Sequence, residues 1–126
     1  MQSGQIVSLR ELSTDRDIVG KYVRVTGNIV MLDFVNRLCQ IEHGGVGLWV
    51  NIERIDTLNV VLKESSLVQF IGEVRSGERI DLRVPAEYGK VNYFLLAKVA
   101  RVVDGLDMTL YEQALSSRRD FFRSTT

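Results

Sequence analysis

Alternation of apolar and polar residues around a central glycine, over residues 21–32, constrains the fold of this chain most strongly. In KYVRVTGNIVML, the residues Val23, Val25, Ile29 and Met31 fall on one face of an extended segment. A two-residue period of this kind predicts a half-buried β-strand. Gly27 lies inside the segment, and an interior glycine predicts a sharp bend or a bulge rather than a flat strand.

Four further strand-like segments follow the first one along the chain. They cover residues 37–43, 46–52, 67–75 and 93–103. Gly44-Gly45 joins the second segment to the third as a two-residue hairpin, because tight hairpin turns need positive φ angles. Gly72 lies inside the fourth segment. We expect Gly72, like Gly27, to be critical to the fold, since a narrow barrel bends its strands where no Cβ intervenes.

One segment between the third and fourth strands changes to a helical period. Ile55, Leu58, Val61 and Leu62 are spaced so that they share one face of a helix. We therefore predict a helix within residues 53–66.

The predicted order of elements is β-β-β-α-β-β-α, with a second helix over about residues 106–122. This is the order of the five-stranded oligonucleotide/oligosaccharide-binding (OB) barrel. We predict an all-β barrel with helices in a single domain over residues 1–126, with the barrel over about 20–103 and frayed ends at 1–8 and 123–126. Another small barrel, of the SH3 kind, is the alternative, although such barrels usually lack a helix between the third and fourth strands.

The charge balance of the chain restricts nucleic-acid binding. Its 126 residues include 16 basic and 16 acidic ones, so the formal net charge is zero. Proteins that bind nucleic acid tightly by themselves usually carry a basic surface, because neutralising phosphates supplies most of the affinity. Any nucleic-acid role should therefore be local, weak or shared with a partner.

Residues for catalysis or metal binding are scarce. His43 is the only histidine and Cys39 the only cysteine, whereas a zinc site needs at least three protein ligands. No serine has the context of a nucleophile, and no glycine-rich loop suits a phosphate. We predict a protein that is not an enzyme and holds no cofactor or metal. The lone cysteine fits a reducing compartment, and the sequence predicts neither a membrane span nor a secretory signal.

Aromatic and basic residues occur where an OB barrel binds single strands. In that fold the second and third strands, with the 1–2 and 4–5 loops, form a groove in which aromatic side chains stack on bases. The possible DNA contacts are Phe34, Arg37, Trp49, Arg79, Arg83, Tyr88, Lys90 and Tyr93. Acidic residues share the 4–5 loop, and packing within the barrel is the alternative role of each aromatic residue.

The predicted C-terminal helix carries more apolar surface than one small barrel needs. One stripe contains Met108, Tyr111, Leu115 and Phe122, and beside it lie Leu110, Ala114 and Phe121. Together the two stripes span roughly 160° of the helix, wider than the ~100° that packing on one core usually needs. We expect one stripe to cap the barrel and the other to face a partner, with the assignment of the two left open. The alternative is a single wide stripe packed on the barrel.

Three segments in this order resemble a known family. They are YVRVTG (22–27), LVQFIGEV (67–74) and VDGLDMTLYEQALSSRRDFF (103–122). The chain resembles the smallest, Ten-type subunit of the CST telomere complex, in its plant-like form, and the resemblance extends from residue 8 over nearly the whole chain. That family is similar in plan to the small subunit of replication protein A.

The resemblance implies a non-catalytic OB subunit that forms a heterodimer with the Stn-type subunit through C-terminal helices. Arg24 on the first strand and Phe121 near the end of the last helix correspond to interface positions of the family. The resemblance also implies a place in the nucleus, at the telomere. The family's complex binds single-stranded DNA mainly through its larger subunits and works in end protection and in C-strand fill-in by DNA polymerase α–primase. A small subunit of a replication protein A-like complex and a free-standing single-strand-binding module are the alternatives.

Overall fold

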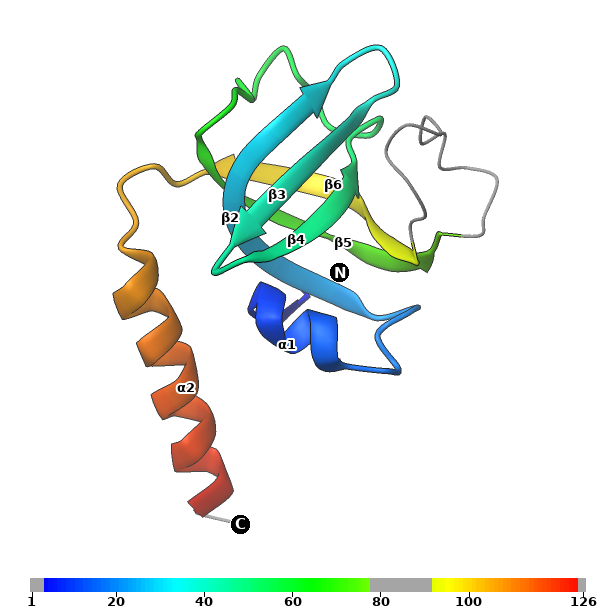
Figure 1. Ribbon diagram of the computed structural model, residues 1–126. Helices are drawn as coiled ribbons and strands as arrows, with labels where there is room; N and C mark the ends of the chain where they lie inside the picture. The colour runs from blue at the N-terminus through cyan, green and yellow to red at the C-terminus, as the bar shows by residue number, and fades with distance from the viewer. Residues whose placement is uncertain (1–3, 78–91, 125–126) are drawn as a thin grey trace.

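The computed structural model describes residues 4–77 and 92–124, with the backbone alone from residue 118 onward. Within this part of the chain, a six-stranded sheet has the order β1-β2-β3-β4-β6-β5 and closes on itself because β2 also pairs with β5. The elements are β1 (Gln5–Ile6), α1 (Leu9–Thr14), β2 (Tyr22–Asp33), β3 (Leu38–His43), β4 (Val46–Asn51), β5 (Leu67–Ser76), β6 (Tyr93–Val102) and α2 (Met108–Ser124). The five long strands form the barrel wall, which confirms the predicted OB barrel (Figure 1).

β2 pairs first with β5 and then with β3, and Gly27 lies near the point where the partner strand changes. Residues 22–28 of β2 pair with β5, whereas residues 28–33 pair with β3, with a register shift between Ile29 and Met31. A Cβ added to Gly27 would lie 3.2 Å from the Cβ of Ile41 and 3.2 Å from Cδ1 of Leu9. Gly27 therefore lies where neighbouring residues leave little room for a side chain. The bulge that was expected there lies slightly further along the strand, between Ile29 and Met31.

Gly72 permits a very close approach between the backbones of β5 and β6. A Cβ on Gly72 would overlap the carbonyl oxygen of Leu96 and would lie 2.8 Å from the Cα of Ala97. The ladder between the two strands shifts register at this point, between Ile71 and Gly72. The strand bends here because no side chain intervenes.

A short helix near the N-terminus, rather than frayed chain, closes one end of the barrel. β1 pairs in parallel with β2, and α1 follows at once. Ser8 and Glu11 form a capping box, in which each side chain accepts a hydrogen bond from the other's backbone N–H. Leu9 and Leu12 point into the core, at 2% and 1% exposure. The expectation that residues 1–8 fray is therefore wrong for the described residues from Gln5 onward.

The predicted helix within residues 53–66 is wrong. This segment forms turns instead. The side chain of Asp56 accepts hydrogen bonds from the N–H of Leu58 and from the amide of Asn59, and such local bonds compete with helix formation. Ile55 reaches the core, but Leu58 is 94% exposed, so the residues expected to share one face do not.

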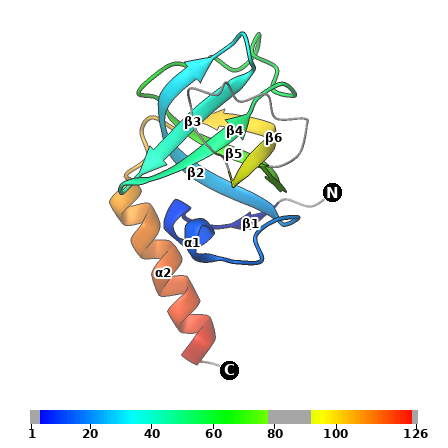
Figure 2. The same cartoon turned by 45° about the vertical axis from the view of Figure 1, so that its right-hand side comes forward.

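α2 projects away from the barrel as the last element of the chain. Figures 1 and 2 show it running beside α1 and beyond it, so that the far end of the helix lies away from the strands. None of the helices in the described ranges is long and apolar enough to cross a membrane. The helix that was expected over about residues 106–122 is present as α2. α1 also closes one end of the barrel, through Leu9 and Leu12.

Candidate partner helix and nucleic-acid face

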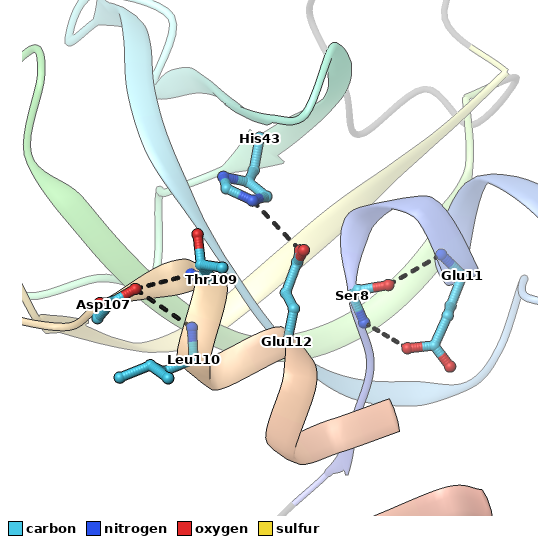
Figure 3. Close-up of polar contacts among 7 residues, drawn as sticks. All are labelled: Ser8, Glu11, His43, Asp107, Thr109, Leu110 and Glu112. Carbon is cyan, nitrogen blue, oxygen red and sulfur yellow. Dashed lines mark hydrogen bonds and ion pairs between the residues drawn. The ribbon is translucent and has the colours of Figure 1, made fainter. Parts of the chain in front are cut away.

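The direction of α2 is set by the turn that precedes it. Asp104 accepts a hydrogen bond from the N–H of Leu67 on β5, at 2.7 Å, which ties the turn to the barrel. Asp107 then caps the helix, because its Oδ1 accepts the N–H groups of Thr109 (3.0 Å) and Leu110 (3.2 Å) (Figure 3). The start of α2 is therefore fixed to the sheet through side chains that belong to the turn.

A second contact links α2 to the tip of the β3–β4 hairpin. His43 Nε2 lies 3.3 Å from a carboxylate oxygen of Glu112, and this pair is ionic only when the histidine is protonated (Figure 3). Gly44 and Gly45 form the hairpin turn at positive φ angles of 60° and 80°, as the sequence predicted. The hairpin thereby presents His43 toward the helix, a contact that the sequence analysis did not predict.

A cleft of about 530 Å³ lies between α1, the hairpin and α2. Its lining consists of Ser8, Arg10, Glu11, His43, Gly44, Thr109, Glu112, Gln113, Leu115 and Ser116. Most of these side chains are polar. The residues of α2 that are partly covered are Met108, Tyr111, Glu112 and Leu115, whereas Thr109, Gln113 and Ser116 are exposed.

The two apolar stripes of α2 differ in exposure. Met108, Tyr111 and Leu115 are half-buried. Leu110 is 63% exposed and Ala114 is exposed as well. The hydroxyl of Tyr111 is buried, and no hydrogen-bond partner for it occurs among the described residues. The side chains of Phe121 and Phe122 lie outside the described part.

Arg24 lies on the outer surface of β2, between β1 and β5. Its register partners are Ile6 on β1 and Ile71 on β5, and its side chain is half-buried. Its neighbours Val23 and Val25 are fully buried and face the core. As expected from the alternation, the barrel interior does not contain Arg24.

The predicted DNA contacts lie at three described places and in one segment outside the described residues. Phe34, which is 49% exposed, and Arg37, which has a φ of 58°, lie in the β2–β3 turn. Trp49 is half-buried on β4 opposite Gln40. Tyr93 packs against the core at the start of β6, and burial raises its pKa. Arg79, Arg83, Tyr88 and Lys90 lie outside the described residues.

One aromatic contact with a cation was missed in the sequence. The Nζ of Lys98 lies 5.2 Å from the ring centroid of Tyr22, across from β6 to β2. The two residues are far apart in the chain, and Lys98 lies at the register shift between β5 and β6, between the partners of Ile71 and Gly72.

The described residues include neither a reactive thiol nor a cluster of metal-binding side chains. Cys39 is fully buried on β3, and desolvation raises the pKa of its thiol to about 12. Such a thiol remains protonated near neutral pH and is a poor metal ligand or nucleophile. Among the residues that the structure describes, no group of three or more His, Cys, Asp or Glu side chains could hold a metal ion.

Comparison with known sequences identifies the family. Residues 1–125 match the family described as "Telomere-capping, CST complex subunit". A curated relative, the CST complex subunit TEN1 of Arabidopsis thaliana, is 30% identical over 104 residues, which cover 82% of this chain and 72% of the relative. The chain belongs to the Ten1 family of CST complex subunits. The resemblance noted in the sequence, including its plant-like character, is thus confirmed.

Solved structures show the same fold in Ten1 proteins. The telomere capping protein Ten1 from S. pombe superposes with a TM-score of 0.69 at 14% identity, covering 94% of this chain and 99% of that one. A chain of the S. pombe Stn1–Ten1 complex superposes with a TM-score of 0.68 at 14% identity, covering 94% of each chain. At this level of identity the likeness establishes the fold and not the residues of an interface.

Proposed function

We propose that this Ten1-family chain is a non-catalytic CST subunit that forms a heterodimer with an Stn-type OB subunit through α2. The observation that carries the proposal is a helix whose Leu110–Ala114 stripe faces solvent while α1 already closes the barrel. The existence of a solved Stn1–Ten1 complex from S. pombe supports a partner of this type. The protein is proposed to act in the nucleus, at telomeres.

The proposed interface joins the exposed stripe of α2 to the outer surface of β2. Leu110 and Ala114 supply described apolar surface, and Phe121 belongs to the same stripe by its spacing. Met108, Tyr111, Leu115 and Phe122 form its neighbouring edge. Arg24 is the barrel residue of the interface. Arginine and aromatic residues at interfaces often cost ~2 kcal/mol or more of binding energy when truncated.

The role in DNA metabolism is proposed for the assembled complex rather than for this chain alone. Together with the Stn-type and largest subunits, the chain would help to hold single-stranded telomeric DNA, protect the chromosome end and support C-strand fill-in by DNA polymerase α–primase. Phe34, Arg37 and Trp49 are the described residues proposed to touch a strand, and Tyr93 also packs against the core. Zero net charge agrees with a minor share of the phosphate contacts.

Co-expression with the Stn-type subunit tests the interface. The double variant Leu110→Asp with Ala114→Asp places two charges on the solvent-facing stripe and should abolish co-purification, because burying an unpaired charge in an interface is strongly unfavourable. A second double variant, Arg24→Ala with Phe121→Ala, should weaken the affinity for the Stn-type subunit at least tenfold, equal to about 1.4 kcal/mol of binding free energy. Val35→Asp, at a 92% exposed position in the β2–β3 turn, is the matched control.

The controls separate the interface from the fold. Every variant should retain a cooperative thermal transition, since Leu110 and Ala114 are exposed. Wild-type binding by the Leu110/Ala114 variant would exclude this face of α2 as the interface. Co-purification of the wild type with replication protein A subunits, instead of the Stn-type subunit, would favour the alternative assembly.

A further inference from the structure

A second groove, of about 510 Å³, lies between the end of β6 and the turns that replace the expected helix. Its lining consists of Asn59, Val60, Val61, Lys63, Ser66, Ala100, Arg101, Val102 and Asp104. It shares no residue with the cleft beside α2. None of the residues proposed for the Stn-type partner or for DNA lines it.

One wall of this groove is an open edge of the sheet. β4 pairs with β6 only near the start of β6 and then diverges from it. The N–H of Val103 donates to the carbonyl of Leu67 on β5, at 2.8 Å. Because backbone groups alternate sides along an antiparallel strand, the N–H and C=O groups of Ala100 and Val102 point away from β5. In the described part of the chain, no strand pairs with this stretch of edge.

The lining also contains exposed apolar side chains. Val61, from the turns, is 70% exposed, and Val102, from β6, is 39% exposed. Beside them, the hydroxyl of Ser66 is buried in a residue of 3% exposure, and it has no hydrogen-bond partner among the described residues. A buried polar group without a partner is costly, so a ligand that supplies an N–H or a C=O there gains binding energy.

The charges around the groove favour an acidic ligand. Lys63 and Arg101 are both exposed on its lining. Asp104 is the acidic residue of the lining, and one of its carboxylate oxygens already accepts the N–H of Leu67. A carboxylate in the ligand would therefore meet two cations and one partly engaged anion.

We propose that this groove binds an extended segment of a partner protein, which adds a strand to the edge of β6. Its main chain pairs with Ala100 and Val102, an aliphatic side chain fills the space against Val61, and an acidic side chain lies near Lys63 and Arg101. Strand addition of this kind takes its affinity from main-chain hydrogen bonds and its specificity from alternate side chains. A nucleic-acid strand lacks the repeating N–H and C=O groups that such an edge selects.

The test uses the full chain and a fluorescein-labelled octapeptide in which valine and glutamate alternate. Fluorescence anisotropy should show saturable binding tighter than about 1 mM. An octapeptide of the same kind with proline at its two central positions should not bind, because proline cannot pair as a strand.

Two variants of the chain locate the binding. Val61→Asp removes an apolar side chain of the lining and adds a charge that repels the glutamates, and Val102→Pro removes an N–H that makes no bond to β5. Each variant should weaken the affinity for the octapeptide at least tenfold, equal to about 1.4 kcal/mol. Leu58→Asp is the matched control, because Leu58 is 94% exposed in the same loop but does not line the groove, and it should leave the affinity within about twofold.

Several outcomes would overturn the proposal. They are the absence of saturable binding, equal binding by the proline-containing peptide, and wild-type affinity of the Val61→Asp variant. Displacement of the octapeptide by a single-stranded oligonucleotide would assign the groove to nucleic acid instead. Should Val102→Pro lose its cooperative thermal transition, Val61→Asp still decides the result, since its side chain is mostly in solvent.

Discussion

Two glycines of the same sheet, Gly72 and Gly47, differ in what a side chain would meet. A Cβ on Gly72 would meet backbone atoms of β6, whereas a Cβ on Gly47 would come within 3.3 Å of the flexible end of the Gln40 side chain. Backbone in a ladder cannot yield without the loss of hydrogen bonds, but a side-chain amide can rotate. The importance of a glycine in this barrel therefore depends on which atoms face it.

Gly72→Ala should destabilise the protein by about 3 kcal/mol or more, because overpacking against backbone forces β5 and β6 apart. Gly72→Glu should leave no folded protein, since it adds an unpaired charge at the same crowded position. Gly47→Ala should leave the free energy of unfolding within about 0.5 kcal/mol of the wild type. Urea denaturation followed by circular dichroism compares the three. Equal midpoints for Gly72→Ala and the wild type would show that β5 and β6 have room for a side chain.

At the scale of elements, periodicity predicted the five long strands and the hairpin, but it wrongly predicted a helix within residues 53–66. Strand alternation and Gly44-Gly45 are local signals, so they were sufficient. The apolar spacing in 53–66 was compatible with a helix, but Asp56 stabilises a turn there. α1 is only six residues long, which is too short for a helical period of apolar residues to be recognised. Ser8 and Glu11, at the spacing of a capping box, nevertheless indicate the start of a helix.

The candidate interface was predictable in part for the same reason. The existence of α2 and its two stripes followed from residue spacing. Its direction did not, because that depends on Asp104 bonding to Leu67 and on His43 meeting Glu112, contacts between residues distant in sequence. The exposure of Leu110 now distinguishes the two stripes, which spacing alone left open.

Removal of α2 should leave the barrel folded. A chain that ends at residue 106 keeps Asp104 and its hydrogen bond to β5. It loses the contact between His43 and Glu112, which is partly exposed, and the half-buried side chains of Met108, Tyr111 and Leu115. We expect a cooperative thermal transition together with complete loss of co-purification with the Stn-type subunit. Deletion of residues 1–14 is the contrasting variant, and it should unfold the protein because Leu9 and Leu12 belong to the core. An unfolded chain after the first truncation would mean that α2 is part of the barrel's own packing.

For the molecule as a whole, charge limits what the isolated chain does. Equal numbers of acidic and basic residues leave no net attraction for a polyanion. Some cations are also committed within the fold: Lys21 is paired with Asp15 at 2.8 Å, and Lys98 lies over Tyr22. Affinity for single strands should therefore come from the assembled complex.

The isolated chain should bind a labelled single-stranded oligonucleotide more weakly than about 1 µM at physiological salt, with a shallow salt dependence. Anisotropy titrations at two salt concentrations measure both quantities. Trp49→Ala should change this weak affinity by less than about tenfold. A base stacked on an aromatic side chain contributes roughly 1–3 kcal/mol, and this contribution is reduced when the strand is only loosely bound. Sub-micromolar affinity that is lost in Trp49→Ala would instead favour the free-standing module.

The closure of the barrel between β2 and β5 has a consequence for the order of events during synthesis. These strands come from distant parts of the chain, and β6 must leave the ribosome before the wall is complete. Distant pairings of this kind make folding slow compared with that of helical bundles. α2 is made directly after β6, so its solvent-facing stripe emerges when the strands of the barrel are already available to fold. A nascent chain built in this order offers its partner helix only after every strand of the barrel has been synthesised.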